Sequence, residues 1–223
     1  MLSKEQILNL AERLTTNNPG NVGPTYLQHL TQVGDIAVEI LGNIRRNNSS
    51  FSINFDEVAS TAYLHDIGRP LAKEQGFHEF RGARFVEQNG IKEDIADSSK
   101  DIFRIAQVIR SHGFAFESWQ EQGYSDLRKE FGSLDSNLLI PRTWQEAIIA
   151  YSDLASLGGK RVTMQERMGE LLERYKKDPN FKDQRVVRVA NAAYPQVLEL
   201  GARVEALEQG KLTDGEIARY GFL

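Results

Sequence analysis

The chain has 223 residues, with 31 acidic side chains, 27 basic side chains and no cysteine, and its formal net charge is −4. This length suits one large domain with a substantial core, and we expect a single domain over residues 1–223. The charge excludes the broad basic field of proteins that bind nucleic acids or anionic membranes, and the lack of cysteine excludes disulfides, thiolate metal sites and a thiol nucleophile.

The sequence also lacks the apolar segments that direct a chain to a membrane. No stretch approaches the roughly 20 apolar residues of a membrane span. The N-terminal sequence MLSKEQILNLAERL carries charges within its apolar pattern and lacks the uninterrupted apolar core of a signal peptide. We therefore expect a cytoplasmic protein whose partners include neither a membrane nor a nucleic acid.

The first predicted elements are two helices separated by a turn. Ser3 and Gln6 have the spacing of a capping box, and apolar residues at helical spacing extend the first helix to about Leu14. The run TTNNPGNVGP interrupts the pattern, and a longer amphipathic helix follows over about residues 25–46. His29 lies on or beside the apolar face of this second helix, which predicts that it is buried.

The stretch ASTAYLHDIG, residues 59–68, organises the rest of the chain. It belongs to a predicted helix that begins near Asn54 and stops at Gly68. Within its apolar part the only charged residue is Asp66, which directly follows His65. A carboxylate removed from water is costly unless something compensates it, and a metal ion does so for an adjacent His and Asp. We therefore predict that His65 and Asp66 are metal ligands.

Two further predicted helices each carry a histidine. His78 begins the first of them, and Gly82 shares its face, which indicates either room for an ion or substrate or close helix packing. A short helix at about 91–96 leads into a longer one over about 98–111, and His112 continues the apolar stripe of that helix.

Residues 113–142 form the least regular part of the chain and contain scattered aromatic residues. A connection this long is usually functional or contains short helices, and we expect a lid or a substrate-contacting segment. Thr143 then caps a helix to about Leu157, in which Asp153 is the only charge after residue 147. This repeats the pattern around Asp66, a single carboxylate in an uncharged helix.

The remaining chain reads as helices that follow Gly158-Gly159. Two amphipathic helices rich in Glu and Arg come first, and Pro195 should kink the second. A short helix at about 214–220 closes the pattern. Because no alternating strand pattern or fixed-period repeat occurs, the predicted fold class is all-α.

The histidines and the two singled-out aspartates occur in the order His, His-Asp, His, His, Asp. This order resembles the HD-domain superfamily of metal-dependent phosphohydrolases. The matching stretches are YLQHLTQV, AYLHDIGRP, FHEFRGA, VIRSHGF and IAYSDLAS. The resemblance covers about residues 25–160 and implies an HD-domain-like helical bundle, with a C-terminal helical extension over about residues 161–223.

The resemblance implies a set of metal ligands, in which His65 and Asp66 are also the expected catalytic pair. The superfamily's minimal set, which holds one ion, maps onto four residues: His29, His65, Asp66 and Asp153. His78 and His112 fall where the binuclear branch adds two histidines. Neighbours on a helix point about 100° apart, so His65 and Asp66 should not aim at one point but should flank two ions, with Asp66 bridging. Two such ions would share a hydroxide and hold a phosphoryl oxygen.

The metal and the substrate contacts are predicted less narrowly. We expect two divalent transition-metal ions, with Fe or Mn favoured and Zn, Ni, Co or Mg also compatible. Cations near the proposed ligands are candidate phosphate contacts, although for all of them except Arg69 a solvated surface charge is an at least equally good explanation: Arg69, Arg81, Arg84, Arg110, Lys160 and Arg161. Arg69 is the nearest in sequence, and it stands where many relatives have lysine, to which a planar guanidinium is not equivalent.

Three functions follow from this pattern. The first is hydrolysis of a phosphoester or phosphoanhydride in a small molecule, a nucleotide above all, by a metal-bridging hydroxide. The second is a di-iron oxygenase acting on a small hydroxylated or phosphonate substrate, because some relatives with the same ligands resemble such enzymes. The third is a nucleotide-sensing or interaction module without activity, which the retention of all six ligands disfavours. The oligomeric state stays open.

Overall fold

A computed structural model describes residues 1–18, 22–49, 51–72, 77–177 and 184–219 of the chain. Its principal helices are α1 (Lys4–Asn17), α2 (Tyr26–Asn47), α3 (Phe55–Leu64), α4 (His78–Asn89), α5 (Ser99–Arg110), α8 (Trp144–Leu154), α9 (Met164–Lys177) and α10 (Arg185–Glu208). Shorter helices are η1 (Arg69–Leu71), α6 (Ala115–Gln120), η2 (Gln122–Tyr124), α7 (Ser125–Phe131), η3 (Ser136–Leu139) and α11 (Asp214–Ala218). The predicted all-α class is confirmed.

Most helix starts lie where the caps predicted them. The Ser3 hydroxyl accepts from the backbone N–H of Gln6 at 3.3 Å, and the Gln6 side chain accepts from the N–H of Ser3 at 2.8 Å. Thr143 and Glu146 form the same reciprocal pair at the start of α8. Local side-chain chemistry therefore defines these helix ends.

Three boundaries differ from the prediction. Helix α3 ends at Leu64, because the N–H of Ile67 donates to the carbonyl of Leu64 at 2.9 Å and tightens the chain into a turn. The predicted short helix at 91–96 is a turn, in which Asp94 has a φ of 55°. Helix α8 stops at Leu154 rather than at residue 157.

The residues after α8 form a hairpin that the sequence pattern did not reveal. Strands β1 (Ser156–Leu157) and β2 (Lys160–Arg161) pair antiparallel. Gly158 and Gly159 between them have φ angles of 56° and 84°, the left-handed conformation that a two-residue hairpin turn requires. The strands are too short for an alternating pattern to show.

The C-terminal predictions hold in outline. Pro195 lies within the continuous helix α10, and the predicted kink there stays a prediction. Helix α11 ends at Ala218, two residues short of the predicted position 220, which lies outside the described residues. None of the helices that the structure describes combines the length and the apolar character needed to cross a membrane.

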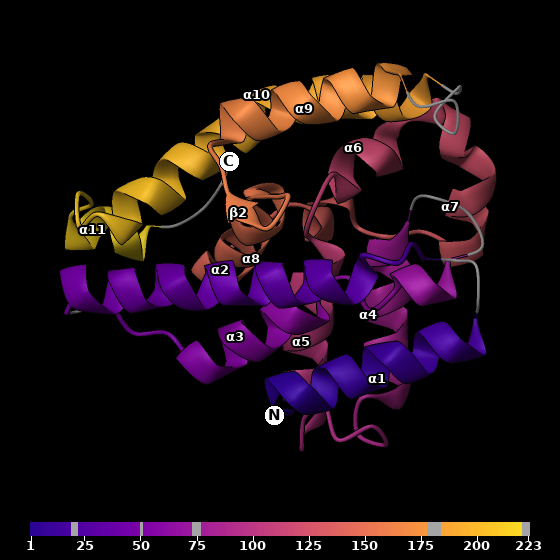
Figure 1. Ribbon diagram of the computed structural model, residues 1–223, viewed down its shortest axis with the longest axis horizontal. Coiled ribbons are helices and arrows are strands. Elements are labelled where there is room, and N and C mark those ends of the chain that lie inside the picture. The colour runs from indigo at the N-terminus through magenta and orange to yellow at the C-terminus, as the bar shows by residue number, and fades with distance from the viewer. Residues whose placement is uncertain (19–21, 50, 73–76, 178–183, 220–223) are drawn as a thin grey trace.

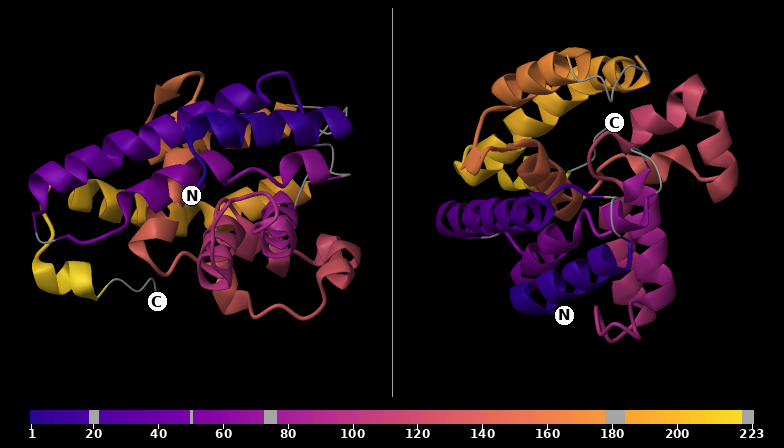
Figure 2. Two further views of the ribbon diagram at one scale, coloured as in Figure 1. Left: turned by 90° about the horizontal axis from the view of Figure 1, so that it is seen from below. Right: turned by 45° about the vertical axis from the view of Figure 1, so that its right-hand side comes forward.

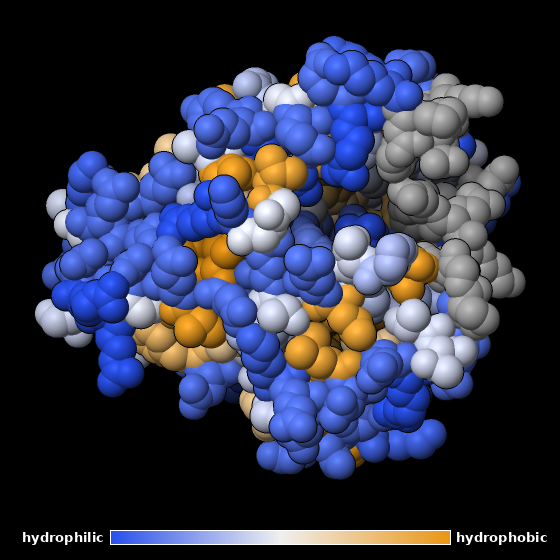
Figure 3. Space-filling model, in the orientation of Figure 1, coloured by the Kyte–Doolittle hydropathy of each residue, from blue (hydrophilic) through white to orange (hydrophobic). Residues whose placement is uncertain are grey.

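Helix α2 crosses the middle of the molecule, with α1 and α3 on one side and the α9–α10 pair on the other (Figure 1). A second view shows α9 and α10 lying together above the rest of the bundle (Figure 2). On the face seen in Figure 3 the surface is mostly hydrophilic, with separate apolar patches, and it is hollowed beneath α9. Helix α2 thus links the elements that precede and follow it in the chain.

The core has two main parts that meet near the end of α3. One contains buried apolar residues of α2, α3, α8, α9 and α10, including Ala62 and Leu154. The other contains residues of α1, α4, α5 and the start of α2, together with Leu64 and Ile67. His65 and Asp66 lie between Leu64 and Ile67, so the turn after α3 places them where the two parts of the core join.

Gly34 allows α2 to approach α3 closely. A Cβ at this position would overlap the ring of Tyr63, whose hydroxyl donates to the carboxylate of Asp35 at 2.5 Å. We predict that Gly34→Ala lowers the free energy of unfolding by about 1–3 kcal/mol, because the overpacked helices must separate. Denaturant titration measures this change.

The matched control is Gly169→Ala in α9, where no atom lies within 4 Å of the added Cβ. It should leave the protein as stable as the wild type or more stable by about 1 kcal/mol, since Ala favours helix. Equal stability of Gly34→Ala and the wild type would contradict the close packing of α2 on α3.

Candidate metal centre

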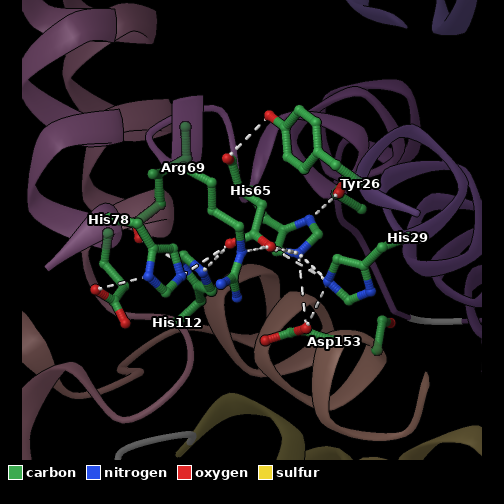
Figure 4. Close-up of polar contacts among 12 residues, drawn as sticks. Tyr26, His29, His65, Arg69, His78, His112 and Asp153 are labelled. Carbon is green, nitrogen blue, oxygen red and sulfur yellow. Dashed lines mark hydrogen bonds and ion pairs between the residues drawn. The ribbon is translucent and has the colours of Figure 1, made fainter. Parts of the chain in front are cut away.

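Six side chains predicted as ligands converge in one place (Figure 4). They come from separate elements: α2 supplies His29, the turn after α3 supplies His65 and Asp66, α4 begins with His78, the residue pair after α5 supplies His112, and α8 supplies Asp153. Their ligand atoms form three overlapping groups, each with atoms within 4.8 Å of one another. Residues far apart in sequence therefore share one polar cluster.

Asp66 lies at the centre of this cluster, and its two oxygens face different histidines. Oδ1 lies 2.8 Å from Nε2 of His78 and 3.4 Å from Nε2 of His112. Oδ2 lies 3.3 Å from Nε2 of His29 and 3.5 Å from Nε2 of His65. The carboxylate thus joins two pairs of imidazoles, as a bridging ligand would.

Asp153 adds a second carboxylate, and the shortest distances recorded for it are to His29 and His65. Its Oδ1 lies 3.2 Å from Nε2 of His29 and 3.6 Å from Nε2 of His65, and the two Nε2 atoms are 3.3 Å apart. Ligands at about 2.0–2.2 Å from a tetrahedral ion lie roughly 3.3–3.6 Å from one another. The spacing of these atoms therefore fits an ion between them.

Backbone carbonyls fix the orientation of the two buried histidines. Nδ1 of His65 donates to the carbonyl of Ala62 at 2.8 Å, and Nδ1 of His112 donates to the carbonyl of Ile109 at 2.5 Å. A carbonyl can only accept, so each Nδ1 carries a proton and each Nε2 faces the carboxylates with a lone pair or a second proton. Two facing lone pairs repel, which leaves a cation as the group that satisfies both sides.

The charges of the cluster are strongly coupled. Burial raises the pKa of Asp66, but Arg69 and the histidines His65, His78 and His112 outweigh it and hold that pKa well below its usual value. Burial lowers the pKa of His65, but Asp66 and Asp153 outweigh it and raise the pKa to about 10. The centre therefore demands positive charge, which protons supply when no metal does.

The expectation that His65 and Asp66 cannot aim at one point is wrong. Their Nε2 and Oδ2 atoms are 3.5 Å apart and, with His29, form one ligand group. His65 still has helical backbone angles, φ −49° and ψ −39°, so the directions at the backbone do not determine where the ends of the two side chains lie. The tyrosine hydroxyl of Tyr26 donates to the backbone carbonyl of Asp66 at 3.1 Å and holds this turn in place.

Close packing, rather than open space, explains the glycine next to His78. A Cβ on Gly82 would lie 3.0 Å from Cγ2 of Ile109 and 3.1 Å from the backbone nitrogen of Gly68. A Cβ on Gly68 would overlap the carbonyl oxygen of His78. The two glycines let the turn after α3 touch the first turn of α4, and this contact brings His78 to Asp66.

Three side chains near the cluster escaped the sequence analysis as site residues. Glu79 is buried, and its Oε2, 3.5 Å from Nδ1 of His78, has no hydrogen-bond partner among the described residues. Tyr26 is a buried residue of α2, and in the sequence it is indistinguishable from the other apolar residues of that helix. Burial raises the pKa of Tyr175 on α9, against the lowering effect of Arg174, Arg167 and Arg69, and the charge of Asp153 raises it further. Of the three, only Glu79 could have been noticed in the sequence, because it directly follows His78. An acidic residue in the first turn of a helix is equally well explained by the helix dipole.

The predicted phosphate contacts have different surroundings. Arg69 pairs with Asp66 and its side chain is 40% exposed, so it reaches from the cluster to the surface. Arg81 pairs with Glu130 at 2.8 Å.

The other predicted cations belong to neighbouring contacts. Arg110 pairs with Glu87, and Lys160 is exposed on β2. Arg84 lies over the ring of Phe131, and Arg161 pairs with Glu208. Arg69 contacts the cluster through Asp66. The substrate-binding role of all these cations, Arg69 included, stays a prediction.

Comparison with known proteins gives one match. A family model described as HD domain matches residues 26–148, more than half of the chain. The match includes five of the six converging residues and ends before Asp153. No curated protein and no solved structure matches the chain.

The contact between Gly68 and His78 leads to a prediction about metal retention. Gly68→Ala should reduce the metal content of protein purified without chelator, because the added methyl group pushes the first turn of α4 away from Asp66. Elemental analysis measures the content. Gly215→Ala, at a position with no atom within 4 Å of the added Cβ, is the control and should retain metal. Full metal content in Gly68→Ala would refute the argument.

The raised pKa of His65 predicts how the metal-free protein responds to pH. A histidine whose pKa is higher in the folded than in the unfolded state stabilises the fold. This stabilisation is complete at pH values below the unfolded-state pKa of about 6.5, and it is lost as the pH rises through the folded-state pKa. Protein stripped of metal by a chelator should therefore lose stability between about pH 6.5 and the folded pKa of about 10. Thermal unfolding as a function of pH measures the loss.

His65→Gln removes the titrating group and should flatten this decline. If the metal-free wild type instead became more stable over the same range, the coupling of His65 to the two carboxylates would be wrong.

Proposed function

The chain belongs to the HD domain family, and from that premise we propose that it is a metal-dependent phosphohydrolase with a binuclear centre. The proposed substrate is a small phosphorylated molecule, a nucleotide first. The division of the Asp66 carboxylate between two pairs of histidines is the observation that carries the proposal. A site for a single ion would not need both oxygens to face separate imidazole pairs.

Two overlapping ligand groups would hold the ions. His29 and His65, with Asp153, face one oxygen of Asp66. His78 and His112 face the other. When bound, two divalent ions act as Lewis acids on a phosphoryl oxygen and lower the pKa of water towards neutrality. Nitrogen and oxygen donors of this kind suit Mn, Fe, Co, Ni and Zn.

The exposed side of the cluster indicates where substrate would enter. His29 is 25% exposed and Arg69 is 40% exposed, whereas His65 and His112 are fully buried. Arg69 is always charged, and its planar fork can bind two phosphate oxygens at once. We assign it the role of orienting the phosphoryl group at this open side.

The chain's own electrostatics favour a small substrate over a polymer. The net charge is −4, and the cations around the site pair with acidic side chains such as Glu87 and Glu130. A nucleic-acid backbone would need an extended basic surface for several phosphates. One arginine beside the centre suits one phosphoryl group.

A di-iron oxygenase is the second candidate, because the same four imidazoles and two carboxylates also suit iron. The two functions separate in one pair of assays on metal-loaded protein. Phosphate release from a nucleotide panel without O2 consumption supports the hydrolase. O2 consumption together with a mixed-valent iron EPR signal supports the oxygenase.

His65→Ala and Asp66→Ala test the function directly. Each substitution removes a proposed metal ligand, so the content of bound metal should fall. The value of kcat/KM for phosphate release should also fall, by more than about 100-fold. Metal analysis and phosphate assays measure the two effects. Asp56→Ala, an exposed acid at the start of α3, is the control and should keep both. Full activity in a variant that has lost its metal would exclude the proposed chemistry.

A further inference from the structure

The residue before His78 has an unusual backbone conformation. Phe77 has φ 57° and ψ 22°, the left-handed region that residues other than glycine rarely adopt. Crowding of Cβ against the carbonyl makes this conformation cost about 1–2 kcal/mol. Such a residue persists only where its surroundings determine its position.

Aromatic side chains supply those surroundings. The Phe77 side chain is 1% exposed, and four rings surround it at centroid distances of 4.9 Å for Phe80, 5.3 Å for Tyr124 and 6.1 Å for both Trp119 and Phe131. Three of these rings come from the 113–142 segment, in α6, η2 and α7. Burial of a phenylalanine ring stabilises by about 1.5–3 kcal/mol, which exceeds the backbone cost.

Phe77 also determines where α4 begins. It is the N-cap residue of α4, and its carbonyl accepts the first helical hydrogen bond, from the N–H of Arg81 at 3.1 Å. His78 follows as the first helical residue and touches Gly68 through its own carbonyl. The direction of the His78 side chain is therefore fixed by Gly68 on one side and by the backbone of Phe77 on the other.

We propose that Phe77 is a positioning residue of the metal centre: the aromatic cluster holds its backbone left-handed and thereby directs Nε2 of His78 at Oδ1 of Asp66. This inference rests on the proposed binuclear function. It gives the 113–142 segment a role apart from substrate contact, because its rings act on the centre through Phe77. Since His78 faces only one oxygen of Asp66, only one of the two ions depends on Phe77.

Calorimetric titration of Mn²⁺ into metal-free protein tests the proposal. The wild type should bind two ions. In Phe77→Leu one ion should bind at least about 10-fold more weakly, as for loss of a supporting residue, while the other keeps its affinity. Trp119→Leu leaves residue 77 intact and should weaken the same ion, so the test survives if Phe77→Leu folds poorly.

Two controls distinguish positioning from general loosening. Phe103→Leu changes a ring that is 57% exposed on α5 and should alter neither ion. Ile7→Ala destabilises the core at α1, remote from α6 and α7, and should not weaken one ion selectively. Equal weakening of both ions in Phe77→Leu, or no weakening, would overturn the role of Phe77.

Glycine at position 77 isolates the backbone contribution. Phe77→Gly and Phe77→Ala both remove the ring, but glycine adopts a positive φ at no steric cost. Phe77→Gly should therefore bind the ion that depends on His78 more tightly than Phe77→Ala does. The reverse order, or equal affinities of the two variants for that ion, would contradict the proposal. A wild type that binds no Mn²⁺ would instead refute the metal centre itself, which keeps the two failures distinct.

Discussion

The architecture depends on one buried carboxylate. Asp66 is 0% exposed, and an uncompensated charge in that position would cost several kcal/mol. Compensation comes from imidazoles on α2, on α4 and after α5, together with Arg69. Each of these elements must pack closely enough to bring one nitrogen to Asp66. The close approaches at Gly34, Gly68 and Gly82 therefore serve the same packing that forms the polar centre.

The second carboxylate ties the C-terminal part of the chain to this centre. Asp153 lies on α8, whose buried residues pack in the same core part as those of α9 and α10. At the far end of α10, the side chains of Asn47, the last residue of α2, and of Asn48, its C-cap, donate to the carbonyls of Glu208 and Leu207, each at 2.7 Å. The helices after the matched HD region therefore support the element that completes the ligand set.

Much of the fold and of the candidate site could be predicted because both leave local signals. Apolar stripes and capping residues mark the helices, and an isolated Asp66 or Asp153 in an apolar stretch marks a carboxylate that needs a cation. The missed features depend on tertiary contacts. Nothing local requires Asp94 or Phe77 to adopt a positive φ, and the apolar pattern continues past Leu64 although the helix does not. Glu79 reads as an ordinary acid of a first helical turn, and only the fold places it beside His78.

In the proposed function, Arg69 connects the charge balance of the centre with the recognition of substrate. Its guanidinium and the imidazoles compensate the same carboxylate, so a cation bound among the histidines would compete with Arg69 for Oδ2 of Asp66. A centre that already carries enough positive charge needs Arg69 less as a partner for Asp66, and the partly exposed side chain then has a second anion available in the phosphoryl group. Under the proposed function, Arg69 would thus balance the centre before substrate arrives and bind the phosphoryl group afterwards.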